Sequence, residues 1–127
     1  MSLRSPLGAV LGLGTSGGTH HWWRQRVSAV LLALLGLWFM AALGLAPHRD
    51  YTALHLWLQA PLQAVLMILF VAVSAYHSVL GLSVVIEDYV HGAALKTAML
   101  LSVQLAHLVL GATAAFAVLK IALGSAA

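Results

Sequence analysis

The chain has 127 residues, of which 62% are hydrophobic and only 7% carry a formal charge. Soluble domains carry charge on roughly a quarter of their residues, so this composition excludes a soluble globular protein and indicates a membrane protein. The net charge of +3 is small and dispersed, which gives no indication of a nucleic-acid partner and fits a membrane protein with cationic ends. Because the chain has no cysteine, it has no disulfide, thiolate zinc site or iron–sulfur cluster of its own. Redox chemistry would therefore need histidine ligands or a bound cofactor.

The first 19 residues are rich in glycine and serine and show little hydrophobic pattern. We expect residues 1–19 to form a mobile leader and residues 20–127 to form the membrane domain. A cleaved secretory signal is the alternative, because basic residues precede the first apolar run. The long polar lead-in and the two further apolar runs argue against it.

Three apolar stretches are long enough to cross about 30 Å of hydrocarbon, which takes roughly 20 residues. They cover approximately residues 27–45, 61–86 and 95–123. The predicted fold is therefore all-α, with three transmembrane helices. The link after the second span is short, so the second and third spans should be antiparallel neighbours. Residues 46–60 are predicted to form a loop that lies along the headgroups.

The basic residues predict the orientation in the membrane. Cytoplasmic flanks of transmembrane helices carry an excess of lysine and arginine. Four basic residues fall on the side of the N-terminus and only two on the other side. They are Arg4, Arg24, Arg26 and Lys96 against Arg49 and Lys120. We therefore expect a cytoplasmic N-terminus and a periplasmic C-terminus.

The second apolar stretch carries one ionisable side chain, His77. Such a group is costly in hydrocarbon, which makes it a functional-site candidate by default. Imidazole is the usual axial ligand of haem iron in membrane cytochromes. Gly81 lies one turn further along the same face, where a porphyrin edge would need room. We predict that His77 binds haem iron; the structural alternative is an imidazole hydrogen-bonded to a neighbouring serine or carbonyl.

A second histidine, His107, lies near the middle of the third stretch. At 1.5 Å per residue, His77 and His107 both lie roughly 15 Å from the cytoplasmic side. Two arrangements are open. Both histidines clamp one haem within this chain, or the second axial ligand comes from another subunit and His107 is a packed polar group.

Asp88 and Tyr89 follow Glu87 where the second span leaves the bilayer. A neutral phenol is a hydrogen-bond donor at physiological pH, and Tyr89 could donate to a quinone carbonyl and stabilise charge that develops on reduction. Asp88 could support proton delivery. A polar loop with an interfacial aromatic residue is the alternative reading.

His20, Arg24 and Arg26 lie just before the first span, on the same predicted side. Guanidinium groups there could pair with haem propionates. The alternative is that they only set the topology, and for Arg24 we favour this alternative. Ser28, at the membrane edge, is interpreted as a helix cap or a packing group.

Taken together, these features resemble the small hydrophobic membrane anchor subunit of succinate dehydrogenase, the second of the two anchors of respiratory complex II. Three features carry the resemblance, which covers roughly Gly18 to Leu123. They are the segment Gly18–Ala29, the three-span plan, and the spacing from His77 to Gly81 and then to Asp88-Tyr89. There are two departures. His91 and Gly92 stand where some relatives have a basic residue and a proline, and His107 has no role in the pattern.

The resemblance implies a role for each candidate residue. His77 would be the metal site, as axial ligand to haem b, with the other ligand supplied by the larger anchor. Tyr89 would hydrogen-bond the ubiquinone and Asp88 would be its acidic neighbour. Arg26 and His20 would be cofactor-binding residues near the haem propionates and the quinone pocket.

The implied protein is a three-helix anchor in the bacterial inner (cytoplasmic) membrane that packs with a second three-helix anchor, the cytochrome b subunit. It tethers a flavoprotein and an iron–sulfur subunit, so that the complex oxidises succinate and reduces ubiquinone. This chain would hold no succinate-oxidising centre. The alternatives are a fumarate reductase or menaquinone-type anchor, a stand-alone di-histidine cytochrome, and a cofactor-free membrane scaffold.

Overall fold

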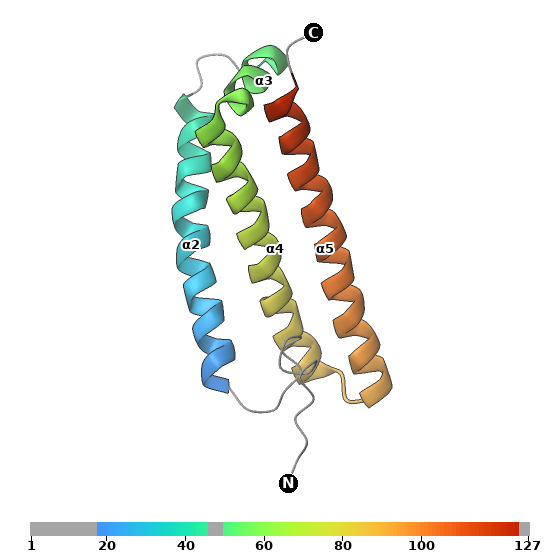
Figure 1. Ribbon diagram of the computed structural model, residues 1–127. Helices are drawn as coiled ribbons and strands as arrows, with labels where there is room; N and C mark the ends of the chain where they lie inside the picture. Colours follow the sequence, from blue (N-terminus) through green and yellow to red (C-terminus); the bar gives the residue numbers. More distant parts are fainter. Residues whose placement is uncertain (1–17, 46–49, 125–127) are drawn as a thin grey trace.

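The computed structural model describes residues 18–45 and 50–124, all of whose regular elements are helices (Figure 1). Three helices are long and apolar enough to cross a membrane. They are α2 (Gly18–Leu45), α4 (Pro61–Tyr89) and α5 (Ala93–Leu123). Their 28, 29 and 31 residues span about 42–47 Å, which exceeds the hydrocarbon thickness. The all-α prediction with three spans is confirmed.

The first long helix starts earlier than the predicted span. α2 begins at Gly18, well before Val27, so the polar stretch of histidines and arginines is helical and not an irregular lead-in. Each of these side chains therefore has a fixed direction around the helix axis. Residues 1–17 of the predicted leader lie outside the described residues, and its mobility stays a prediction.

α4 lies between the other two long helices (Figure 1). It packs against α2 on one side and against α5 on the other, whereas α2 and α5 make no contact within the described ranges. α4 and α5 are antiparallel, as the short link between them predicts. The three helices thus form a layer and not a closed bundle.

Very little of this layer is buried. Five apolar side chains are inaccessible among the described residues: Ala64, Leu80, Ile86, Leu100 and Val118. Many leucines, valines and aromatic residues are instead exposed along all three spans. An apolar exterior of this kind is stable only in lipid or against another apolar protein surface.

The prediction for residues 46–60 is wrong in part, because Tyr51–Gln59 form a fourth helix, α3. Asp50 caps this helix: its side chain accepts a 2.8 Å hydrogen bond from the Ala53 amide. Ala60 ends α3 in an extended conformation (φ −68°, ψ 123°), which the following Pro61 favours, and Pro61 then starts α4.

α3 closes the end of the layer opposite the start of α2. It packs against α4 and α5, and its Trp57 ring stacks on Trp38 of α2 with the centroids 5.7 Å apart. The Gln59 amide also donates to the Gly124 carbonyl at 3.1 Å. These long-range contacts are what the local sequence pattern could not predict.

Candidate functional site

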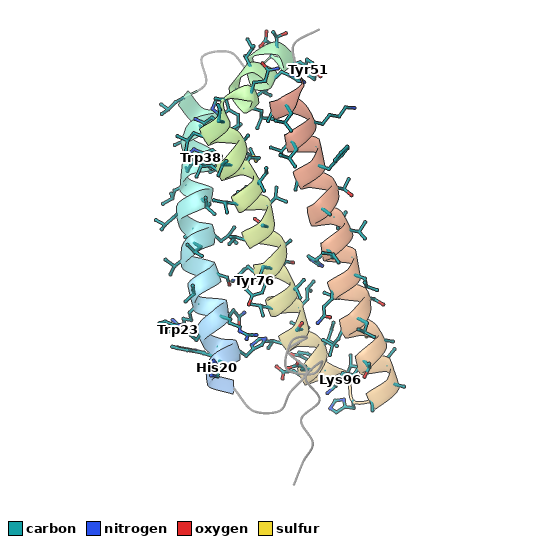
Figure 2. All side chains as sticks on the ribbon, in the orientation of Figure 1. His20, Trp23, Trp38, Tyr51, Tyr76 and Lys96 are labelled. Atoms are coloured by element: carbon teal, nitrogen blue, oxygen red, sulfur yellow. The ribbon has the colours of Figure 1, made fainter. Side chains whose placement is uncertain are left out.

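The candidate residues gather in one half of the layer. The start of α2, the end of α4 and the start of α5 lie at the same end of the molecule (Figure 1). Figure 2 shows His20 and Trp23 on α2 and Lys96 on α5 at this end, with Trp38 and Tyr51 towards the other. The antiparallel order thus brings the basic segment of α2 to the same membrane surface as the acidic end of α4.

His77 lies between α4 and α2 and is partly buried. Its Nδ1 atom is 2.9 Å from the Ser28 hydroxyl oxygen, and the same hydroxyl donates to the Gln25 carbonyl at 3.0 Å. Nε2 has no hydrogen-bond partner in the described part of the chain, and it is not enclosed by protein atoms either. One ring nitrogen therefore fixes the side chain to α2, and the other has no partner among the described residues.

The flank of His77 is open at Gly81. A Cβ atom placed on Gly81 would meet nothing within 4 Å, so this glycine serves no helix–helix contact inside the chain. By contrast, a Cβ on Gly111 of α5 would lie 3.6 Å from the Ala75 Cβ atom of α4. Gly36 on α2 is equally open, but it has no histidine one turn away. Open space thus exists at Gly81, one turn from His77 on the same face of α4.

His107 is held differently. Its Nδ1 atom is 2.8 Å from the Val103 carbonyl oxygen, and its Nε2 atom is 2.9 Å from the Ser78 hydroxyl. A carbonyl only accepts, so Nδ1 carries the proton, and Nε2 of a neutral ring accepts from Ser78. Both ring nitrogens are therefore occupied between α4 and α5. This arrangement favours the reading of His107 as a packed polar group over the haem clamp within this chain.

Asp88 and Tyr89 are the last residues of α4, and both are exposed. The Tyr89 side chain is 78% exposed, and neither side chain has a hydrogen-bond partner among the residues described. At 100° and 1.5 Å per residue, Asp88 lies on the His77 face about 16 Å further along, and Tyr89 is turned about 120° from it. The pair is therefore at the rim and available to a ligand or another subunit.

Two hydrogen bonds hold the turn after α4. The Val90 amide donates to the Ile86 carbonyl at 2.9 Å and closes the end of α4. The Lys96 ammonium group of α5 donates to the Glu87 carbonyl at 3.0 Å and ties the start of α5 to the end of α4. The position of the Asp88-Tyr89 pair is consequently set by both helices.

The two predicted cofactor-binding residues on α2 are both exposed. The Arg26 guanidinium carbon lies 4.7 Å from the centroid of the Trp22 ring, a cation–π arrangement within one helix. Arg26 is two residues before Ser28, so helix geometry places it almost on the opposite side of α2 from His77. His20 lies in the first turn, further from His77 along the axis. Their roles towards a cofactor stay predictions.

The structure places two further residues beside His77 or in a groove next to it, Arg24 and Ser28, which the sequence does not predict as cofactor-binding residues. Arg24 is four residues before Ser28, on the same face of α2. Together with Ser28 and Tyr76 it lines a groove of about 360 Å³ between α2 and α4. The helical spacing from Arg24 to Ser28 was readable in the sequence, but the α4 partner was not. Of the two readings of Ser28, the helix cap is wrong, because Ser28 lies well inside α2, whereas the packing group is confirmed, because Ser28 is buried against α4.

This geometry defines a class of protein: a helical membrane protein of three spans. One histidine, His77, is held between two of the spans, and its Nε2 atom has no partner among the described residues. The family described as succinate dehydrogenase/fumarate reductase transmembrane subunit matches residues 1–121, and the chain belongs to this family.

Known relatives agree with this family. The chain is 37% identical over 89 residues to a succinate dehydrogenase hydrophobic membrane anchor subunit of Rickettsia conorii, covering 69% of this chain and 71% of the relative. It is 34% identical over 122 residues to the subunit of the same name from Paracoccus denitrificans, covering 95% of this chain and 94% of the relative. These likenesses support a membrane anchor subunit of succinate dehydrogenase.

Proposed function

We propose that this chain is the anchor that shares haem b with a second anchor subunit and forms part of the ubiquinone reduction site of succinate dehydrogenase. One observation carries the proposal: His77 presents an uncommitted Nε2 beside the open flank of Gly81, whereas His107 has no ring nitrogen to spare. No group of three or more histidine, cysteine or acidic side chains that could hold a metal occurs in the described ranges. Iron in this chain would accordingly be held by a porphyrin and a single histidine.

The donor set suits a haem group. A neutral imidazole nitrogen is a common axial ligand, and the apolar surroundings suit the porphyrin plane. Haem would supply a one-electron carrier within the membrane. His77 orients the ligand nitrogen, and Gly81 leaves space beside it. His77 would hold the group from this side, and the uncovered outer faces of the layer leave surface for a partner anchor that would complete the site.

The exposed end of α4 supports a quinone site at the membrane surface. Tyr89 donates its hydroxyl proton in a hydrogen bond to a quinone carbonyl and stabilises the negative charge that develops there. Asp88 orients water or neighbouring groups that deliver protons. His20 and Arg26, at the same end of the layer as Asp88 and Tyr89, would bind the haem propionates or the quinone by hydrogen bonds, with Arg26 as the cationic partner.

The assembly follows from the orientation. The N-terminus and the end of α4 face the cytoplasm, where the flavoprotein and iron–sulfur subunits bind, and the C-terminus faces the periplasm across the bacterial inner membrane. Electrons from succinate oxidation pass to ubiquinone at this surface. Succinate chemistry belongs to the soluble subunits and not to this chain. A fumarate reductase anchor working with menaquinone is the second candidate, because the family description covers both enzymes.

The test is the visible spectrum of the purified complex. His77→Ala should abolish the absorbance of a low-spin b-type haem, whereas His107→Ala should keep it, because of these two histidines His77 alone keeps a ring nitrogen without a partner among the described residues. A wild-type complex without haem, or a His77→Ala complex that keeps it, would refute the proposal. Loss of haem in His107→Ala alone would favour the stand-alone cytochrome.

A further inference from the structure

Ser28 is the least exposed residue in the described part of the chain, with 4% of its surface accessible. It lies in the contact between α2 and α4, and all but one of the other buried residues in the described ranges are apolar. Burying a hydroxyl costs free energy unless it is hydrogen-bonded, and alanine would fill the same place without that cost. The hydroxyl at this position therefore needs an explanation beyond packing, because alanine would pack equally well.

The proton of this hydroxyl can be located. Ser28 Oγ lies 3.0 Å from the Gln25 carbonyl oxygen and 2.9 Å from His77 Nδ1. A serine hydroxyl has one proton, and a carbonyl oxygen can only accept. If the proton goes to Gln25, both contacts are satisfied only when His77 donates from Nδ1 to the Ser28 oxygen. The back-bond to Gln25 thus makes Ser28 an acceptor towards the histidine.

This direction sets the tautomer of His77. A neutral imidazole with its proton on Nδ1 has its lone pair on Nε2, the nitrogen without a partner among the described residues. Ser28 also holds the plane of the ring, because its oxygen is fixed by the helix backbone. The partner of Nδ1 generally orients a metal-binding histidine and makes it a more basic ligand.

We propose that Ser28 is a positioning residue for the haem ligand: by accepting from Nδ1–H it directs the lone pair of His77 Nε2 towards the iron and strengthens it as a ligand. The inference rests on the proposed function, since it concerns the same haem site. It also makes the ligand geometry depend on α2, a helix that supplies no ligand itself.

The experiment uses the whole complex, purified with its other subunits. Ser28→Ala removes the acceptor, which leaves Nδ1–H unpaired and the ring free to turn. We expect the haem midpoint potential to shift in the positive direction, because a less basic ligand stabilises ferric iron less. We also expect haem to be lost to excess apomyoglobin about 10 to 100 times more readily, the usual cost of removing such a partner. Unchanged potential and haem loss in Ser28→Ala would overturn the proposal.

A matched pair of variants separates positioning from packing. Ser28→Thr keeps the hydroxyl and Ser28→Val has nearly the same shape without it. Threonine should restore the wild-type potential and the low-spin electron paramagnetic resonance signal, whereas valine should behave like alanine. Equal potentials for threonine and valine would overturn the proposal, even if Ser28→Ala failed to assemble. Ser78→Ala, which removes the serine bound to His107, should leave the haem potential unchanged.

The failure of this inference and the failure of the proposed function give different results. If the wild-type complex carries no haem bound through His77, the proposed function fails whatever Ser28 does. If haem depends on His77 but the Ser28 variants match the wild type, only the positioning role fails.

Discussion

The α2–α4 contact and the α4–α5 contact contain the same three residue types, and they differ in whether a histidine nitrogen and the space at a glycine remain free. Each has a histidine with a serine hydroxyl 2.9 Å from one ring nitrogen and a glycine four residues further along the chain. In the first, His77 keeps Nε2 uncommitted and Gly81 faces open space. In the second, His107 uses both nitrogens and Gly111 packs against Ala75.

The difference lies in the neighbouring backbone. The Ser28 proton is taken by a carbonyl of its own helix, so the serine accepts from His77. His107 instead donates to a carbonyl of its own helix and accepts from Ser78. One contact is therefore suited to ligand binding and the other to joining two helices. A His-x-x-x-Gly spacing does not distinguish them by itself.

The largest expected effect is at the open end of α4. Tyr89→Phe removes the proposed donor to the quinone, which should lower quinone reduction on the order of 100-fold, as the loss of one transition-state donor often does. Succinate oxidation with an artificial acceptor should continue. Steady-state assays with ubiquinone and with the artificial acceptor check this. Unchanged quinone turnover would remove Tyr89 from the mechanism.

Gly81→Leu tests the open flank of His77 directly. A leucine there would project into the space assigned to the porphyrin, at a cost of about 1–3 kcal/mol, which corresponds to a loss of haem affinity of about fivefold to 150-fold. The haem content per complex, measured after washing in detergent, should fall accordingly. Full haem retention with an unchanged spectrum would place the haem elsewhere.

The matched change at the closed contact is Gly111→Leu. Here the new side chain meets Ala75 of α4, so it should separate α4 and α5 and destabilise the chain by about 1–3 kcal/mol. The complexes that do assemble should keep their haem. Thermal unfolding in detergent, followed together with the haem spectrum, distinguishes this result from that of Gly81→Leu. Haem loss from Gly111→Leu without destabilisation would contradict the assignment of the α4–α5 contact to packing alone.

The smallest expected effect belongs to Ser78→Ala. His107 Nε2 would lose its donor, which should lower the free energy of unfolding by about 0.5–1.5 kcal/mol. The spectrum of the haem should stay the same, because His107 is not expected to touch the iron. Thermal unfolding and a difference spectrum of the same sample measure both. A changed haem spectrum would instead support His107 as a haem ligand.

The sequence by itself determined the class of protein, the three spans, and the position of His77 as the one ionisable group within its apolar run. These conclusions depend on composition and on local hydrophobic length, which do not require knowledge of neighbours. The family resemblance was also readable from the spacing of His77, Gly81 and Asp88-Tyr89, and the comparisons confirm it.

Only the tertiary structure decided which nitrogens are free, which glycine is open and which serine meets which histidine. Ser28 and His77 are 49 residues apart in the chain, and no local pattern predicts which faces of two apolar helices will meet. The helix α3 was missed for a related reason, because it is held by contacts with α4, α5 and Trp38 as much as by its own cap. Hydrogen-bond direction is a property of the packed helices, since a single proton on Ser28 is assigned by two neighbours at once.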